Sequence, residues 1–295
     1  MGDRFSLSWC MGSREEGKFI RDFLREKNIS KSALTDIKFK GGSITVNGEE
    51  TTVRYALRES DLLKVIFPEE VPSVGLKGEL LPLEIIYEDE SLLVINKPAE
   101  MNTIPSREHP CGSLANALIG YYDNAGIPST THIVTRLDRN TTGLVLVAKH
   151  RHVHHLLSLQ QKYGQLRRVY EAFTEGWLAG AEGKVEEPIG RKETSIIERE
   201  VRPDGQYACT FYQVIERKKN FTWVELRLET GRTHQIRVHM SHLGHPLLGD
   251  GLYGGNNTHI KRQALHCKRL TFSHPLSEEI LEFEVGLPTD MGRLL

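Results

Sequence analysis

One stretch of the sequence places an acidic side chain between two basic ones, immediately before a run of apolar residues. Asp138 lies between Arg136 and Arg139 in RLDRNTTG, and the apolar run covers 144–148. A carboxylate that faces an arginine stays ionised well below neutral pH, which suits a nucleophile or an electrostatic stabiliser. An aspartate in a turn can equally cap a helix or bond to its own backbone. The residues alone leave both interpretations open.

A second stretch, LETGRTHQIRVHMSHLGHPLLGD, offers a basic partner for this carboxylate. Arg237 lies near the start of a helix predicted from Ile236 and Met240, with Thr233 as its N-terminal cap. An arginine at such a position is more often a surface residue. Held beside these apolar side chains, however, Arg237 is expected to be partly buried, and a buried charge needs a partner. We predict that Asp138 is that partner, through a forked, two-point contact that fixes the direction of the carboxylate.

Aromatic and imidazole side chains suggest further chemistry. Tyr170 lies within a predicted strand, RRVYEAFTEG, as either a core residue or a flat platform for a nucleobase. Histidines gather in 150–155 and 234–245, but their spacing spreads the imidazoles around helices, and there is no HExxH motif. The sequence also has no glycine-rich phosphate loop. We therefore expect neither a metal nor a nucleotide cofactor.

Apolar periodicity divides the chain into two domains that must position these residues. Residues 14–68 are predicted to form two short helices and then strands, whereas residues 1–13 are expected to be loosely held. The segment 69–82 is rich in Pro, Gly and Glu and is predicted to be a linker. In 83–290 strands outnumber helices and several adjoin through short turns. This pattern favours an α+β fold with a mixed, largely antiparallel sheet.

Composition narrows the class of protein. The chain has 295 residues, of which 39% are hydrophobic and 26% charged, and its net charge is −1. It lacks a signal peptide and an apolar run of the ~20 residues that cross a bilayer, so no membrane partner is expected. Four scattered cysteines are typical of free thiols in a reducing cytosol, which predicts a cytoplasmic protein. Basic residues outnumber acidic ones in 131–175, which fits either a polyanion site or a solvated face.

The N-terminal region resembles a known RNA-binding domain. ISKSALTDIKFKGGSITVNGE, followed by RESDLLKVIF, is similar to the alpha-L domain, which is named after a small-subunit ribosomal protein. The resemblance implies that basic residues of the predicted helices, Lys31 and Lys38 among them, bind RNA. A small α+β module without an RNA role remains the alternative.

Three motifs in the second domain resemble those of the RluA-type pseudouridine synthases. They are RLDRNTTG, RRVYEAFTEG and ETGRTHQIRVHMSHLGHPLLGD, and DESLLVINKPAEM resembles the opening strand of that family. The resemblance implies an isomerase that converts specific uridines of structured RNA to pseudouridine without a cofactor. By resemblance, Asp138 is the catalytic aspartate, Tyr170 stacks on the target base, and Arg237 is the partner of the aspartate.

The same resemblance extends to the surroundings of the site. Arg136, Arg168 and Arg232 fall within the motifs and would contact RNA phosphate or support the site. The family commonly has His where Thr135 stands, and often Lys where Arg168 stands. Family members with this N-terminal domain often act on large-subunit ribosomal RNA, which is therefore the expected substrate. The enzyme is expected to be a monomer. Transfer RNA, a non-catalytic role in ribosome assembly and a metal-dependent hydrolase remain alternatives.

Overall fold

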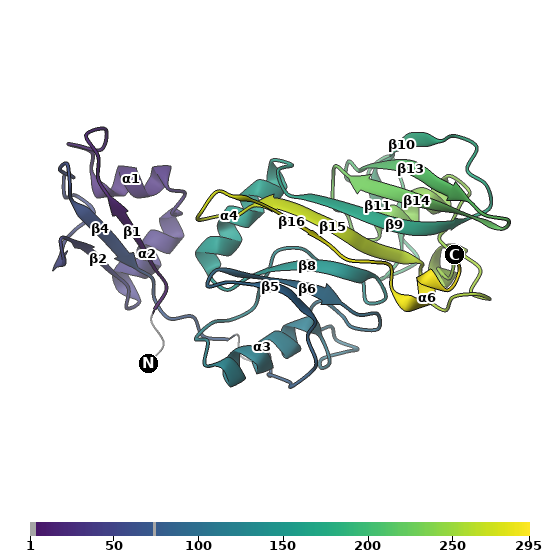
Figure 1. Ribbon diagram of the computed structural model, residues 1–295, viewed down its shortest axis with the longest axis horizontal. Helices are drawn as coiled ribbons and strands as arrows, with labels where there is room; N and C mark the ends of the chain where they lie inside the picture. Colours follow the sequence, from purple (N-terminus) through teal and green to yellow (C-terminus); the bar gives the residue numbers. More distant parts are fainter. Residues whose placement is uncertain (1–3, 73–74) are drawn as a thin grey trace.

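The computed structural model describes residues 4–72 and 75–295, which form a small N-terminal domain and a larger domain beside it (Figure 1). The described part of the N-terminal domain holds a four-stranded antiparallel sheet in the order β1-β4-β2-β3. Its helices pack on this sheet through a core that includes Leu24, Ile37 and Val65. The elements are β1 (Ser6–Cys10), α1 (Ile20–Glu26), α2 (Lys31–Phe39), β2 (Ser43–Val46), β3 (Glu49–Glu50) and β4 (Leu62–Ile66).

Most of the N-terminal elements follow the predicted pattern. Ser30 caps α2, because its Oγ accepts a hydrogen bond from the Ala33 N–H at 3.1 Å. Residues 47–48 make the expected hairpin turn between β2 and β3. The expectation of a loosely held start covered residues 1–3, which lie outside the described residues, and was wrong for β1. This strand pairs with β4 along its whole length, so it belongs to the same sheet although it precedes the predicted range 14–68.

The segment 69–82 connects the domains without a helix or strand in its described part, which leaves out residues 73–74. It is nevertheless tied down at both ends. Glu70 accepts a hydrogen bond from the Arg151 N–H at 2.7 Å, and the Glu79 N–H donates to the Asn116 carbonyl oxygen at 2.9 Å. The predicted linker is therefore a fixed connection and not a free spacer.

The larger domain is built around one mixed sheet, as predicted. The described strands run in the order β10-β13-β14-β9-β15-β8-β6-β5, with β16 on β15 and β7 on β8, and only the β8–β15 pair among them is parallel. All residues of β8 are buried, which fits its apolar sequence. The elements up to β9 are β5 (Ile85–Glu88), β6 (Leu92–Lys97), α3 (Leu114–Ala125), β7 (His132–Ile133), β8 (Thr142–Ala148), α4 (Arg151–Lys162) and β9 (Arg167–Glu175). The later strands of the sheet are β10 (Glu182–Glu186), β13 (Cys209–Arg217), β14 (Phe221–Leu228), β15 (Leu265–Ser273) and β16 (Ile280–Glu284).

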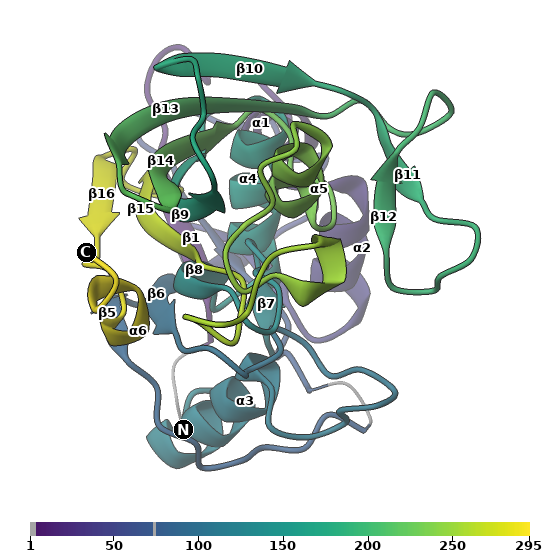
Figure 2. The same ribbon diagram turned by 90° about the vertical axis from the view of Figure 1, so that its right-hand side faces the viewer.

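A two-stranded ribbon, β11 (Ile189–Arg191) and β12 (Arg199–Val201), stands apart from this sheet beside α5 (Gln235–His242) (Figure 2). A 3₁₀ turn, η1 (Gly251–Tyr253), follows α5, and α6 (Thr289–Gly292) lies near the C-terminus. Across the residues that the structure describes, no helix has the length and apolar character needed to cross a membrane.

The strands β8 and β15 meet at one narrow point, where glycine is required. They pair in parallel only at Thr142–His266 and Gly143–Cys267. Gly143 has a φ of +110°, and a Cβ there would lie 2.2 Å from the carbonyl oxygen of Cys267. We expect Gly143→Ala to lower the free energy of unfolding by ~2–4 kcal/mol, because it adds backbone strain and a steric clash.

Urea unfolding measures this effect. Gly286→Ala is the matched control, since a Cβ at this position meets open space at an ordinary φ. Equal stability of the Gly143→Ala protein and the wild type would contradict the close approach of the two strands.

Candidate active site

Asp138 lies in the loop that enters β8, and two buried threonines hold that loop. Thr135 Oγ1 accepts a hydrogen bond from the Leu146 N–H of β8 at 2.9 Å. Thr103 Oγ1 donates to the Leu137 carbonyl oxygen at 2.6 Å and accepts from the Leu137 N–H at 3.2 Å. The Asp138 side chain is 26% exposed. Its backbone is thus fixed while its carboxylate stays accessible.

Thr103→Val tests this support, because valine keeps the shape of threonine but lacks the hydroxyl. The buried N–H and carbonyl of Leu137 would lose their bonds to Thr103, which costs ~1–3 kcal/mol. We expect lower stability in urea and faster hydrogen exchange at the Leu137 amide. The exposed Thr258 provides the control variant Thr258→Val. Unchanged exchange at Leu137 would show that the loop is held by other contacts.

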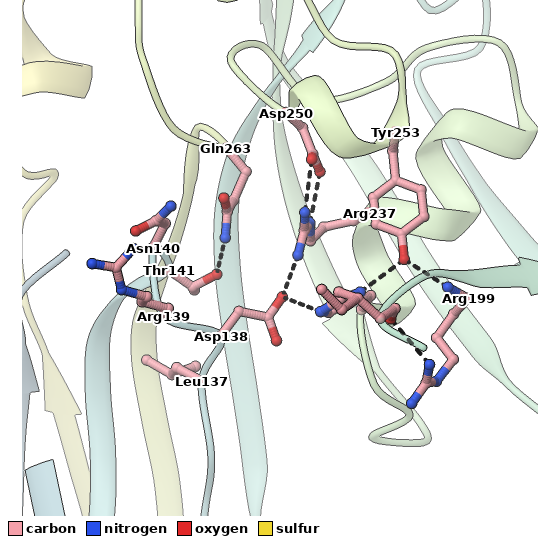
Figure 3. A network of polar contacts seen from close by, with 12 residues as sticks. Leu137, Asp138, Arg139, Asn140, Thr141, Arg199, Arg237, Asp250, Tyr253 and Gln263 are labelled. Atoms are coloured by element: carbon pink, nitrogen blue, oxygen red, sulfur yellow. Dashed lines mark hydrogen bonds and ion pairs between the residues drawn. The ribbon is translucent and has the colours of Figure 1, made fainter. Parts of the chain in front are cut away.

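Arg237, the third residue of α5, is buried and contacts the carboxylate. Its Nη1 donates to Asp138 Oδ2 at 3.0 Å, so the predicted contact is present (Figure 3). The predicted fork to Asp138 was wrong, because Nε and Nη2 donate to the two oxygens of Asp250 at 2.7 and 2.8 Å. Although burial acts to lower the pKa of Arg237, its hydrogen bonds to Asp250 and the charge of that carboxylate raise it overall. Asp250 therefore anchors the guanidinium, and an N–H of Nη1 orients Asp138.

Tyr170 lies in β9 and lines the same pocket as Asp138. Its side chain is almost fully buried, and its hydroxyl accepts a hydrogen bond from Arg168 Nη1 at 3.1 Å. Burial raises the pKa of Tyr170, so the phenol is neutral at physiological pH. The strand thus presents a neutral aromatic ring beside the carboxylate.

The pocket is surrounded by positive charge. Besides Asp138, Tyr170 and Arg237, it is lined by the three arginines of the motifs, Arg136, Arg168 and Arg232. Arg136 and Arg232 are exposed, and Arg168 is half-buried. A carboxylate, an aromatic ring and exposed guanidinium groups together suit a ligand that carries both a flat base and phosphate groups. Lys31 and Lys38 are exposed on α2 and do not line this pocket.

Lys97 supports the site, although the sequence showed it only as the last residue of a strand before proline. Its side chain is fully buried, and Nζ donates to the carbonyl oxygens of Pro98, Met101 and Arg139 at 2.8, 2.9 and 3.1 Å. Burial lowers the pKa of Lys97 to about 7. The side chain joins the loop after β6 to the loop that carries Asp138.

Gln235 was also missed, and it fixes the loop before α5. Its Oε1 accepts from the Arg232 N–H at 2.9 Å, and its Nε2 donates to the Cys209 carbonyl oxygen at 2.9 Å. The prediction that Thr233 caps the helix was wrong. The N-terminal cap is His234, which has a φ of +58° and makes no capping hydrogen bond with its side chain.

The histidine clusters do not converge on an ion. Within the described parts of the chain, no three His, Cys, Asp or Glu side chains are placed to hold a metal together. His150 and His152 stack on Phe5 and Phe67, with ring centroids 4.0 and 5.3 Å apart. Burial lowers the pKa of each of these histidines to about 4. They are therefore neutral packing residues between the two domains.

Known proteins are similar to this chain in sequence and in fold. The sequence profile of the RNA pseudouridylate synthase family matches residues 91–242, which include Asp138, Tyr170 and Arg237. A Bacillus subtilis protein named uncharacterized RNA pseudouridine synthase YjbO is 54% identical over 94% of this chain and 98% of its own length. Ribosomal large subunit pseudouridine synthase D of Haemophilus ducreyi is 41% identical over 75% of this chain and 72% of its own length.

The similarity extends to solved structures. Human RNA pseudouridylate synthase domain containing 1 aligns with a TM-score of 0.59 at 25% identity, over 71% of this chain and 85% of that one. The N-terminal domain lies outside the residues that the family profile matches, so its likeness to the alpha-L domain stays a prediction. By its sequence and its catalytic-domain fold, the chain belongs to the RNA pseudouridylate synthase family and is an RNA pseudouridine synthase.

Proposed function

We propose that this enzyme isomerises uridine in large-subunit ribosomal RNA, with Asp138 as its catalytic carboxylate. The observation that carries the proposal is the 3.0 Å contact from Arg237 Nη1 to Asp138 Oδ2 in a pocket that Tyr170 also lines. The proposed class of substrate is supported by the similar Haemophilus ducreyi protein, which is named a ribosomal large subunit pseudouridine synthase.

The reaction rearranges bonds within one nucleotide. The bond from N1 of uracil to C1′ of ribose breaks, and a bond from C5 to C1′ forms. The hydrogen on C5 leaves as a proton and N1 gains one, so no oxidant is consumed and no net hydrolysis occurs. The isomerisation thus needs an oriented carboxylate and a held base, which are the groups that the pocket provides.

The side chains divide this work. The target uridine must leave its stack, which costs a few kcal/mol, and stacking on Tyr170 offsets part of that cost. An ionised Asp138 can attack the sugar carbon, attack the base or remove a proton from ribose. All three uses require a charged carboxylate of fixed direction, which the bond from Arg237 provides.

The basic residues are proposed to bind the RNA backbone. Arg136, Arg168 and Arg232 line the pocket and would hold phosphates near the target, whereas Lys31 and Lys38 on α2 would bind a more distant part of the RNA. Because Asp138 and Arg237 come from one chain, we also propose that the enzyme acts as a monomer. The free thiols of its four cysteines support a proposed location in the cytoplasm. Sedimentation with bound RNA and cell fractionation test these two points.

The substrate is tested with RNA that carries tritium on C5 of uridine, because that hydrogen leaves during the reaction. We expect the purified enzyme to release tritium from large-subunit ribosomal RNA and not from transfer RNA. Release from transfer RNA alone would reassign the substrate. RNA binding without release from any RNA would favour a non-catalytic role in ribosome assembly.

Tyr170→Phe separates the ring from its hydroxyl. We expect the Kd for RNA to change less than about twofold, because phenylalanine still stacks on a base. The lost bond to Arg168 is a single contact at the edge of the ring. Filter binding measures the affinity. A large loss of affinity would mean that the hydroxyl, and not the ring, holds the RNA.

A further inference from the structure

His234 lies beside the catalytic carboxylate but is not among the residues assigned to the reaction. It occupies the left-handed region with a φ of +58°, which is uncommon for a residue other than glycine and clusters at functional sites. Its side chain is 12% exposed, and its Nε2 lies 3.8 Å from Asp138 Oδ2. The same carboxylate oxygen accepts the hydrogen bond from Arg237.

The other ring nitrogen of His234 lies within hydrogen-bond distance of a hydroxyl group that can donate to it. His234 Nδ1 lies 2.7 Å from the Tyr253 hydroxyl. That hydroxyl also accepts a hydrogen bond from the backbone N–H of Arg199 in β12 at 3.0 Å, and a backbone N–H can only donate (Figure 3). The hydroxyl proton is therefore free to be donated to Nδ1. A neutral imidazole that accepts at Nδ1 carries its own proton on Nε2, which faces Asp138.

Tyr253 also contacts the second group that orients the carboxylate. The guanidinium carbon of Arg237 lies 4.9 Å from the centroid of the Tyr253 ring, within the range of a cation–π contact. One tyrosine thus supports Arg237 with its ring and His234 with its hydroxyl. The strand β12 holds that hydroxyl in place through Arg199.

The charges around His234 are consistent with a neutral ring. Burial lowers the pKa of His234, and Arg237 and Arg199 act in the same direction, whereas Asp138 and Asp250 oppose them. The net shift is downward, so the imidazole is neutral at pH 7 and its single proton can be assigned by the hydrogen-bond network.

We propose that Tyr253 is a positioning residue that holds His234 with its proton on Nε2, so that His234 directs a second N–H at Asp138 Oδ2 beside that of Arg237. Hydrogen bonds at catalytic sites are often long before substrate binds, and the 3.8 Å separation is expected to shorten in the RNA complex. With both donors on Oδ2, the other oxygen, Oδ1, is left for the substrate. Among the described residues, no hydrogen bond reaches Oδ1. The inference rests on the proposed role of Asp138.

The position of the proton can be measured directly by ¹⁵N NMR of the histidine ring nitrogens in the full-length protein at pH 7.5. We expect the His234 signals to show protonated Nε2 and unprotonated Nδ1 in the wild type. In the Tyr253→Phe protein we expect them to shift toward a mixture of the two tautomers. A proton on Nδ1 in the wild type, or an unaltered tautomer in Tyr253→Phe, would overturn the proposal whether or not the enzyme modifies ribosomal RNA.

Kinetics test the consequence for the reaction. Tyr253→Phe keeps the ring over Arg237 and should lower kcat about tenfold with KM for RNA nearly unchanged. In His234→Gln the amide nitrogen can replace Nε2 as a donor, whereas in His234→Asn the shorter amide replaces only Nδ1. We expect the Gln variant to keep kcat within about threefold of wild type and the Asn variant to lose about tenfold.

A double-mutant cycle then tests whether Tyr253 acts on the reaction through His234. In a His234→Asn background, Tyr253→Phe should cause no further loss of kcat, because the hydroxyl acts through the imidazole. The exposed Tyr163 supplies the control Tyr163→Phe. Additive losses, or equal activity of the Gln and Asn variants, would mean that Tyr253 does not act through a donor on His234. If the wild type converts no uridine at all, the proposed function fails, and the NMR result still decides the position of the proton.

Discussion

Replacing Asp138 by asparagine is expected to abolish pseudouridine formation, with a loss of at least about 10³-fold in kcat. The amide has nearly the shape of the carboxylate but carries no negative charge, so it can neither attack carbon nor remove a proton at a useful rate. Because the Asp138 side chain is 26% exposed and its loop is held by Thr135 and Thr103, the fold should not change. The release of tritium from labelled ribosomal RNA under single-turnover conditions measures the effect.

RNA binding supplies the control for this variant. The Asp138→Asn protein should bind RNA as tightly as the wild type or slightly more tightly, since a negative charge is removed from a positively charged pocket. Asp204→Asn changes an exposed aspartate on a turn and should leave kcat unaltered. If Asp138→Asn kept more than a tenth of the wild-type activity, another group would have to perform the chemistry.

The second large effect is expected at Arg237, where stability and activity can be separated. Arg237→Met leaves Asp250, whose side chain is 1% exposed, as a buried carboxylate without its forked partner. Removal of one member of a buried ion pair costs ~3–5 kcal/mol. We expect a loss of this size in urea unfolding, together with a loss of at least about 10²-fold in kcat, because Asp138 also loses its N–H donor.

The double variant Arg237→Met/Asp250→Leu distinguishes the two roles. Replacing both members of a buried pair by apolar side chains is often neutral, so most of the stability should return. Activity should not return, because no donor remains at Asp138 Oδ2 from this position. If activity recovered together with stability, Arg237 would serve only the fold.

The strands and the helix that carry the central residues of this site were predictable from the sequence, whereas the roles of these residues came from the resemblance of three motifs to a known family. The apolar run after Asp138 predicted β8, the stretch RRVYEAFTEG around Tyr170 predicted β9, and the spacing of Ile236 and Met240 predicted α5. A charged residue on the apolar face of a helix needs a buried partner, and this requirement predicted the contact between Arg237 and Asp138.

The supporting residues were not predictable, because their roles depend on contacts between distant segments. Asp250 lies in a glycine-rich stretch without periodicity. The neighbouring sequence does not indicate that its carboxylate accepts the two parallel hydrogen bonds from Arg237. Lys97 ends a strand, where a lysine is usually exposed, yet it is buried against three carbonyl groups. The strand β1 was missed because its partner, β4, lies more than fifty residues later in the chain.

Thr135, which stands where the family commonly has histidine, has a structural explanation in this chain. It is buried, and its hydroxyl bonds to the backbone of β8 at Leu146. A side chain at this position can therefore hold the loop of Asp138 without reaching the pocket, which Thr135 does not line.

The most direct test of the central claim is the mapping of pseudouridines in the ribosomal RNA of a strain that lacks this protein. At least one pseudouridine of the large-subunit RNA should be missing from that strain. It should return when the wild-type gene is supplied, and it should stay absent when the gene encodes Asp138→Asn at equal protein level. An unchanged pseudouridine map in the deletion strain, or full restoration by Asp138→Asn, would contradict the account.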